Sequence, residues 1–566
     1  MIEYKLSWDS PHRHYIDIEV RFPVLQELET VHLSRWRPGR YELGNFAKNI
    51  RDFKVFDENG NSLDYHKVNK DSWRVKNNQN KFLVVKYSYY ANELNAGSTY
   101  LDDRLLYVNP VNCFAFTATT SDLACKVSWE KKEGWELAVG AKHEANSFEV
   151  ANYDELADTP FLYSPDLNKI TLIVQSKKFH ICFNGITEIP EKVEEDFSKF
   201  IERQLLDFDT FPVDEFYFLI FALPETAYHG VEHTTSTVIT LGPKTEIFES
   251  LYTELLGVSS HELYHVWNVK TIKPIDLTPI DYKSENYSRF GWIYEGITTY
   301  LGDWYLMTSG VFSLEEYLEE LSKQFQRHLD NEGRFHYSVA DSSFDTWLDG
   351  YVLGAPGRKV SIYVEGCLLA FYLDVMLRKS TKNEVSLIDF MRELHRLSLH
   401  NEIGYQLDDI QGILSFWLTN EQIENFIDYV HQPTDLLRIL PESLAFLGLE
   451  MQFFTHDDML QRLLGIKVLP KGKRWLITSV KSGSAADLAG IGEEDEIAVI
   501  NGVEVGNFNP EDEPENFNIE LYRKGRKMSF EVLSNYATGY HQIDIVPDES
   551  LDFEPETNRS AWMGRK

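Results

Sequence analysis

The sequence predicts a multidomain α+β protein that begins with a β-sandwich. Three observations support this fold class. Over residues 1–155 apolar and polar side chains alternate, whereas after Pro190 apolar residues recur every three or four positions, and from about residue 446 the short period returns. The chain has 566 residues, which is too long for a single core.

The N-terminal segment carries the pattern of half-buried strands. In residues 16–22 apolar side chains alternate with Asp17, Glu19 and Arg21, and residues 83–89 show the same alternation. Between them, RWRPGRY and DENGNS supply residues that favour turns. No helical period competes, so we expect a β-sandwich over residues 1–155.

The middle of the chain changes to helical spacing. An amphipathic helix is predicted by the five apolar residues Val193, Phe197, Phe200, Ile201 and Leu205. A buried strand, FYFLIFA, follows at 216–222, and long helical segments then continue to about residue 440. We therefore expect a mostly helical domain over 156–445, a shorter-period domain over 446–537 and an acidic tail over 538–566.

The charge balance excludes two classes of partner. The chain has 89 acidic residues against 55 Lys and Arg, a formal net charge of −34. Such a surface repels nucleic acid and anionic lipid. The first residues, MIEYKLSWDS, lack the pattern of a secretory signal, and no apolar stretch is long enough to span a membrane. The four cysteines are scattered, and we expect buried thiols in a cytoplasmic protein.

The segment HELYH, beginning at His261, has the spacing of a metal site. Residues four apart lie on one face of a helix, so His261 and His265 can direct their imidazoles to one point. Glu262 lies beside that point, where it can accept a proton from water. The alternative is an ordinary helix with two partly buried histidines, because this short motif also arises by chance.

A second segment supplies the missing ligand. A catalytic zinc needs a third protein ligand and an open fourth position. Glu295 lies thirty residues after His265, inside the aromatic helical stretch GWIYEGITTYLGDWY, where an unpaired carboxylate would be costly to bury. Thr299 follows one turn later, where we expect it to hydrogen-bond a zinc-binding histidine. The two segments together predict a Zn²⁺ site of His261, His265 and Glu295.

Both segments resemble a known family. HELYH followed by WIYEGITTY resembles the gluzincin metallopeptidases, and the string HELYHVWNVKTIKP is similar to the glycyl aminopeptidase family, PDZ-containing relatives of thermolysin-like enzymes. Further family-like elements occur in the family's order: WRPGRY (36–41), SFDTW (343–347), VSIYVEG (360–366) and SLIDFMREL (386–394). The resemblance implies a thermolysin-like catalytic domain over 156–445.

The resemblance also implies roles for two further elements. GVEH (230–233) resembles the family's Gly-x-Glu-His element, which implies that Glu232, with Gly230 and His233, binds the free α-ammonium of a peptide. Tyr363 in VSIYVEG is similar to a family tyrosine that donates a hydrogen bond to the developing oxyanion. Ile362 and Glu365 depart from the Tyr-Tyr-x-Lys-Gly pattern there.

The C-terminal part resembles a PDZ domain. Ser484 opens a short Ala-rich helix, and INGV closes a hairpin. LLGI (463–466) replaces the usual carboxylate-binding Gly-Leu-Gly-Phe loop, so a peptide or protein ligand at this domain is an open expectation.

These observations lead to one predicted function and two alternatives. We expect a zinc aminopeptidase that removes N-terminal residues from peptides, with Gly or Ala preferred by resemblance. A zinc endopeptidase of the same clan is the first alternative, and a non-catalytic scaffold with a PDZ-like module is the second.

Overall fold

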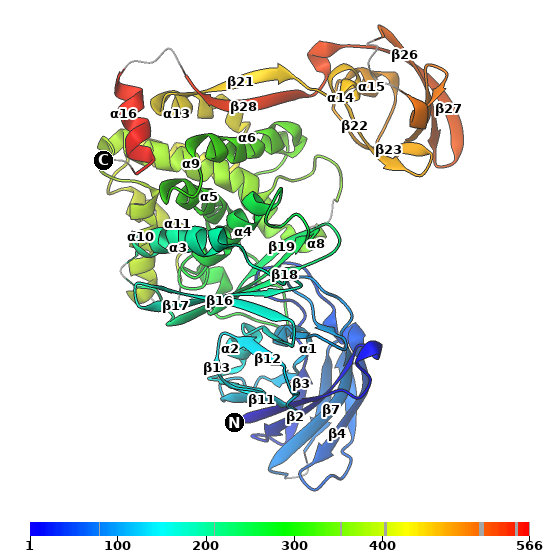
Figure 1. Ribbon diagram of the computed structural model, residues 1–566, viewed down its shortest axis with the longest axis vertical. Coiled ribbons are helices and arrows are strands. Elements are labelled where there is room, and N and C mark those ends of the chain that lie inside the picture. Colours follow the sequence, from blue (N-terminus) through cyan, green and yellow to red (C-terminus); the bar gives the residue numbers. More distant parts are fainter. Residues whose placement is uncertain are drawn as a thin grey trace. The chain divides into compact units, whose positions relative to one another are not determined.

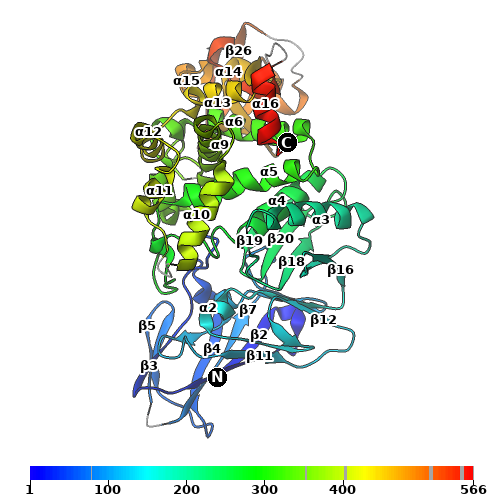
Figure 2. The same ribbon diagram turned by 90° about the vertical axis from the view of Figure 1, so that its left-hand side faces the viewer.

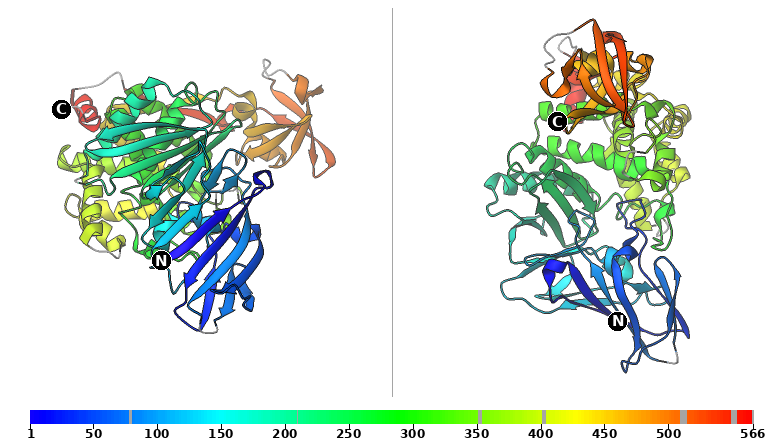
Figure 3. Two further views of the ribbon diagram at one scale, coloured as in Figure 1. Left: turned by 60° about the horizontal axis from the view of Figure 1, so that its bottom comes forward. Right: turned by 90° about the vertical axis from the view of Figure 1, so that its right-hand side faces the viewer.

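Two β-sheets stack face to face in the N-terminal part of the chain, whose strands run from blue to cyan in Figure 3. The computed structural model describes residues 1–77, 80–208, 210–350, 354–400, 404–508, 514–548 and 553–564. In spatial order the larger sheet contains β13 (Lys142–Glu144), β14 (Ser147–Val150), β11 (Cys125–Trp129), β1 (Ile2–Ser7), β2 (Tyr15–Pro23), β7 (Phe82–Tyr90) and β4 (Ile50–Asp57). The smaller sheet contains β10 (Phe116–Thr117), β3 (Leu28–His32), β6 (Ser72–Lys76) and β5 (Tyr65–Asn69).

One apolar core joins the two sheets. Ile18 of β2 and Val85 of β7 meet Val31 and Val75 of the smaller sheet in that core. The two alternating segments of the sequence lie in β2 and β7, which pair in antiparallel register. The predicted β-rich N-terminal domain is therefore confirmed. The four cysteines, all among the described residues, are buried.

A five-stranded sheet forms the next layer. Its strand order is β16 (Leu167–Val174), β17 (Lys177–Asn184), β18 (Glu215–Ala222), β20 (Ser236–Gly242) and β19 (Ala227–Glu232). The central strand β18 runs parallel to both neighbours and is covered on both faces. Phe218 contacts Phe197 of α3 (Glu191–Leu205) on one face, and Phe221 contacts Tyr107 on the other. Burial on both faces explains the continuous apolar run of this strand.

On the other face lies a further four-stranded sheet. It contains β12 (Glu136–Val139), β15 (Phe161–Ser164), β9 (Leu106–Val108) and β8 (Tyr100–Leu101). Its apolar side chains share a core with Tyr217, Leu219 and Phe221 of β18. The remaining short helices of this region are α1 (Pro110–Cys113) and α2 (Tyr153–Ala157).

Strand β19 forms an edge of the five-stranded sheet beside the helix that carries HELYH. It pairs with β20 alone, and Glu232 is its last residue. Helix α4 (Tyr252–Tyr264) packs on β19 and β20 (Figure 2). The helix that carries His261 is therefore held against the strand that carries Glu232.

Close helix packing positions Glu295, the third predicted metal ligand. The π-helical turn η4 (Trp292–Ile297) leads directly into α5 (Thr298–Thr308), which packs on α4 (Figure 1). A Cβ atom built on Gly302 of α5 would lie 3.1 Å from Cα of His261. Helix α9 (Ile362–Thr381) packs on η4, where a Cβ on Gly296 would lie 2.3 Å from Cα of Gly366. Small residues thus bring these backbones together.

Further helices complete the middle of the chain. They are α6 (Leu314–Asp330), α7 (Val339–Phe344), α8 (Thr346–Asp349), α10 (Leu387–His400), α11 (Leu407–Leu414) and α12 (Asn420–His431). Among the described residues, no helix is both long and apolar enough to cross a membrane. The predicted helical character of this region is confirmed.

The chain forms two compact units. One contains residues 1–317, 337–353 and 361–434, and therefore all the elements around HELYH. The other contains residues 318–336, 354–360 and 435–566. The domain boundaries expected from the sequence remain a prediction.

The second unit contains a β-sheet with its own core. This sheet consists of β22 (Ile466–Lys471), β23 (Arg474–Val480), β24 (Glu496–Ile500), β26 (Asn516–Arg523) and β27 (Arg526–Leu533), with β25 (Val503–Glu504) paired to β24. Helices α14 (Met459–Leu464) and α15 (Ala485–Ala489) contribute Leu463 and Ala486 to that core. Ser484 caps α15 as its sequence context suggested.

The segment predicted to be an acidic tail contains regular structure. Within it, β28 (His541–Pro547) pairs with β21 (Leu449–Thr455), and α16 (Phe553–Trp562) packs on α13 (Leu440–Phe446). Trp562 is 0% exposed, and Asn558 Nδ2 donates to the carbonyl oxygen of Phe446. Buried apolar residues in a strand and a helix therefore fix part of this segment. Residues 549–552, 565 and 566 of the predicted tail lie outside the described residues.

The glycine contact between η4 and α9 leads to a stability prediction. Gly296→Ala should destabilise the protein by about 1–3 kcal/mol, because the new methyl group meets backbone atoms that cannot move aside. Gly412→Ala in α11 is the matched control: nothing lies within 4 Å of its built Cβ. That substitution should be neutral or stabilising by about 0.5–1 kcal/mol. Thermal unfolding measures both, and equal shifts would contradict the packing argument.

Candidate metal centre

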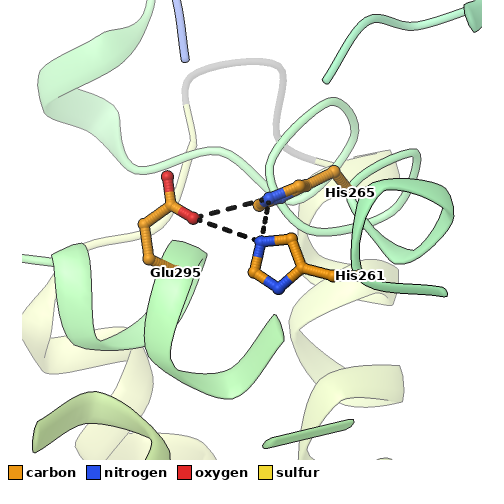
Figure 4. A group of neighbouring side chains, drawn as sticks. All are labelled: His261, His265 and Glu295. Carbon is orange, nitrogen blue, oxygen red and sulfur yellow. Dashed lines mark hydrogen bonds and ion pairs between the residues drawn. The ribbon is translucent and has the colours of Figure 1, made fainter. Parts of the chain in front are cut away.

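Three side chains from two helical segments converge on one point (Figure 4). His261 lies in the last turn of α4, His265 caps that helix, and Glu295 lies in η4. The two Nε2 atoms are 3.0 Å apart. Oε2 of Glu295 lies 3.6 Å from Nε2 of His261 and 3.4 Å from Nε2 of His265. The residues that the sequence predicted as metal ligands are thus brought together.

A hydrogen bond fixes the orientation of His265. Its Nδ1 lies 2.7 Å from the carbonyl oxygen of Asn268 and donates to it. This leaves the lone pair of Nε2 directed toward Glu295 and His261. Asn268 in turn donates to the carbonyl oxygen of Ile293 and to Oγ1 of Thr298. The segment after α4 is thereby tied to the turn that carries Glu295.

Thr299 does not have the partner expected from the sequence. Its hydroxyl donates to the backbone carbonyl oxygen of Glu295, at 2.8 Å. A threonine four residues after an acceptor in a helix readily makes this bond to its own backbone. The carbonyl oxygen of Asn268 orients His265 instead.

The donor atoms fit a tetrahedral cation site. In a zinc site with ligands at about 2.0–2.1 Å, neighbouring ligand atoms are about 3.3–3.4 Å apart. The three distances in this cluster bracket that value. Nε2 of His265 is an acceptor when Nδ1 donates, the carboxylate of Glu295 is an acceptor, and Nε2 of His261 is an acceptor when its proton is on Nδ1. In that state a bound cation satisfies lone pairs that otherwise face one another.

A second carboxylate lies beside the three donors. Glu262 is 5% exposed, and its Oε2 has no hydrogen-bond partner among the described residues. Burial raises the pKa of Glu262 to about 8, with the nearby carboxylate of Glu232 adding to the rise. Gly230 makes this position available, since a Cβ there would lie 2.1 Å from Oε1 of Glu262. A carboxylate so placed is suited to accept and return a proton.

Glu232 reaches the same place from the end of β19. Ligand atoms of Glu232, Glu262 and His265 all lie within 4.8 Å of one another. Glu232 is 4% exposed, and Gly39 of the WRPGRY segment lies directly against its carboxylate. Several buried carboxylates at one place favour the binding of a positively charged ligand group.

Asp158 supports this end of the site, and sequence reasoning missed it. Its carboxylate accepts hydrogen bonds from Nδ1 of His233, from the amide and hydroxyl of Thr234, and from Nζ of Lys270. Burial favours the neutral acid, but Lys270 and His233 outweigh it and hold the pKa of Asp158 well below its usual range. Asp158 therefore links the residue after Glu232 to the segment after His265. The sequence around it, ELADTP, carries no pattern that points to such a role.

Tyr363 borders the metal ligands. It lies in the first turn of α9, and its ring centroid is 6.3 Å from that of His261, with the rings 29° from parallel. Glu365 and Ile362, the two departures from the family pattern, are both buried on the same helix.

Comparisons with known proteins agree with this arrangement. The family model of the Peptidase M61 N-terminal domain matches residues 3–165, and that of the M61 glycyl aminopeptidase matches residues 254–369. The second match contains His261, Glu262, His265 and Glu295. No curated protein matches the chain.

A solved structure shares the fold. The crystal structure of an aminopeptidase N family protein from Idiomarina loihiensis superposes with a TM-score of 0.90 at 24% identity, covering 100% of both chains. An M1 zinc metallopeptidase from Deinococcus radiodurans has a TM-score of 0.46 at 12% identity, covering 77% of this chain and 94% of that chain. The N-terminal part of the chain and the segment that carries the three donors thus each match a model of the M61 peptidase family.

Proposed function

We propose that the protein is a zinc-dependent aminopeptidase that removes small N-terminal residues, glycine or alanine, from peptides. One observation carries the proposal: the donors of His261, His265 and Glu295 converge next to the buried carboxylates of Glu262 and Glu232. A metal site, a proton acceptor and a site for an ammonium group are the parts that removal of one N-terminal residue requires.

Two imidazoles and one carboxylate are a ligand set typical of catalytic zinc. When bound, zinc supplies Lewis acidity, which polarises a carbonyl group and lowers the pKa of water. His261, His265 and Glu295 would hold it. The hydrogen bond from His265 to Asn268 supports this assignment, because metal-binding histidines usually donate their second ring nitrogen to such a partner.

The remaining residues move the proton and bind the charged groups of the substrate. Glu262 accepts a proton from the attacking water at its carboxylate and returns it to the nitrogen of the leaving amine. The phenolic hydroxyl of Tyr363 donates a hydrogen bond to the oxygen that gains negative charge. Glu232, with the adjacent Gly230 and His233, binds the α-ammonium of the substrate, which places the first peptide bond at the metal.

The preference for small residues rests on the family match, whose description names a glycyl aminopeptidase. Glu365 is acidic where the family pattern has lysine, so the preference needs direct measurement. Rates on glycyl, alanyl, leucyl and phenylalanyl amides of one leaving group would supply it.

We also propose that the second unit contains a PDZ-like module. Its sheet and the Ser484-capped helix α15 support this assignment. Gly465 in the LLGI segment has φ of 71° and ends α14 before β22 begins. A peptide or protein ligand at this module remains a prediction.

The ligand assignment predicts the metal content of two variants. His265→Ala should lose stoichiometric zinc, because two donors cannot replace three. The matched control is His180→Ala. His180 is also buried, but it hydrogen-bonds to Thr171 and Glu215 in the five-stranded sheet. Elemental analysis of purified proteins measures both. Equal zinc in the two variants would contradict the assignment.

The role of Glu262 predicts a separation of binding from turnover. Glu262→Gln should retain zinc and lower kcat by about 10²–10⁴-fold, since the amide cannot accept the proton. Glu254→Gln, on the same helix but absent from the cluster, should leave kcat near that of the parent. Comparable kcat in Glu262→Gln and the parent would refute the proton-transfer role.

The role of Glu232 predicts a dependence on the substrate amine. Glu232→Ala should raise KM and lower kcat/KM by at least about 10²-fold for a free-amine peptide, because a charge-assisted hydrogen bond in a buried site is lost. The exposed Glu225, in the turn before β19, gives the control variant Glu225→Ala.

N-acetylated peptides complete this test. They lack the positive charge, so they should be poor substrates for the parent and change little in Glu232→Ala. The two perturbations should not add, since each removes the same contact. Rapid cleavage of acetylated peptides by the parent would favour an endopeptidase instead.

A further inference from the structure

The WRPGRY segment forms a tight turn that the proposed chemistry does not use. Arg37 and Arg40 form an isolated antiparallel bridge, and the amide of Arg40 donates to the carbonyl oxygen of Arg37. Gly39 has φ of 81°, a conformation that favours glycine. We refer to residues 37–40 as the 37–40 turn.

The 37–40 turn lies in contact with the carboxylate of Glu232. A Cβ atom built on Gly39 would lie 2.5 Å from Oε2, 3.0 Å from Cδ and 3.1 Å from Oε1 of Glu232. Even a methyl group therefore has no room unless the carboxylate moves. The backbone of Glu232 is fixed in the ladder with β20, where it pairs with Thr237.

The residues that flank the turn are held by aromatic packing. Nε1 of Trp36 donates to the carbonyl oxygen of Asp281, and the Trp36 ring makes an edge contact with Trp347 at 5.1 Å. The ring of Tyr41 lies 5.4 Å from that of Tyr294, the residue before Glu295. Both flanks of the turn are thus anchored to segments around η4, so the turn has a fixed position relative to the metal ligands.

We propose that the 37–40 turn is the end wall of the substrate site, and that Gly39 is a specificity-determining position. The inference rests on the proposed function of Glu232. The turn occupies the space beyond the carboxylate, where an N-substituent or a preceding residue would have to lie. An unsubstituted α-ammonium group fits between Glu232 and the metal site, and a larger amine does not. Space as well as charge then limits cleavage to the first residue.

Substrates that keep the charge but enlarge the amine separate these two effects in the unaltered protein. Glycyl, N-methylglycyl, N,N-dimethylglycyl and N-acetylglycyl amides of one leaving group are compared, at a pH where the first three are cationic. Each added methyl group should lower kcat/KM by at least about tenfold, mainly through KM, as expected for a methyl group in a closed pocket.

The outcomes distinguish the two proposals. Poor cleavage of the acetylated substrate with unimpaired cleavage of the dimethylated one would overturn the end wall while leaving the ammonium role of Glu232 intact. Rapid cleavage of the acetylated substrate would instead contradict the proposed aminopeptidase function itself.

A pair of glycine variants tests the position of the wall. Gly39→Ala should raise KM for the glycyl amide by at least about tenfold, with a smaller change in kcat and with zinc content retained, because the methyl group displaces the Glu232 carboxylate. Gly60→Ala is the matched control: its φ is 87°, but nothing lies within 4 Å of its built Cβ. It should impose similar backbone strain and leave KM unchanged.

A second-site change strengthens this comparison. In the Glu232→Asp background, whose shorter side chain vacates the contact, Gly39→Ala should raise KM by a smaller factor than in the parent. An unchanged KM in folded, zinc-containing Gly39→Ala, or equal KM changes in Gly39→Ala and Gly60→Ala, would overturn the proposal. If Gly39→Ala does not fold, the methylated substrates decide.

Discussion

The concentration of buried carboxyl groups beside α4 is the constraint on which the site depends. Glu232, Glu262 and Glu295 are 4%, 5% and 2% exposed. Removing several carboxylates from water at one place is unfavourable by several kcal/mol for each uncompensated ion. Imidazole groups and Lys270 compensate part of this charge. A bound cation and a cationic substrate would compensate the rest, so the same electrostatic demand explains both the metal affinity and the affinity for an ammonium group that we propose.

Close backbone approach is the means by which the fold brings these charges together. Gly302 lets α5 reach His261, Gly296 and Gly366 let η4 and α9 meet, and Gly230 leaves room for Glu262 beneath β19. At each of these contacts a larger side chain would force the neighbouring atoms to shift. The positions of the catalytic groups are therefore set largely by residues that carry no functional group.

Sequence reasoning identified the site residues that belong to a recognisable local pattern in the chain. The four-residue spacing of His261 and His265 follows from helix geometry, and Glu295 was found because a buried carboxylate requires a partner. Asp158 could not be found in this way, since its partner Lys270 is 112 residues away in the chain. The π-helical turn at Glu295 was also missed, because apolar periodicity does not distinguish one inserted residue from a regular helix.

An enzyme that cleaves after the first residue of a peptide needs a fixed distance between the group that binds the ammonium and the group that acts on the carbonyl. In this fold the groups that we propose for these roles lie on different elements, since Glu232 ends an edge strand and the proposed metal donors lie on helical segments. The ladder with β20 holds one side of this edge strand, and further contacts hold the segment that follows Glu232. Asp158 provides such contacts, because it binds His233 beside the strand end and Lys270 beyond α4 at the same time. We therefore propose that the buried ion cluster and the ladder with β20 together set the distance that selects the peptide bond.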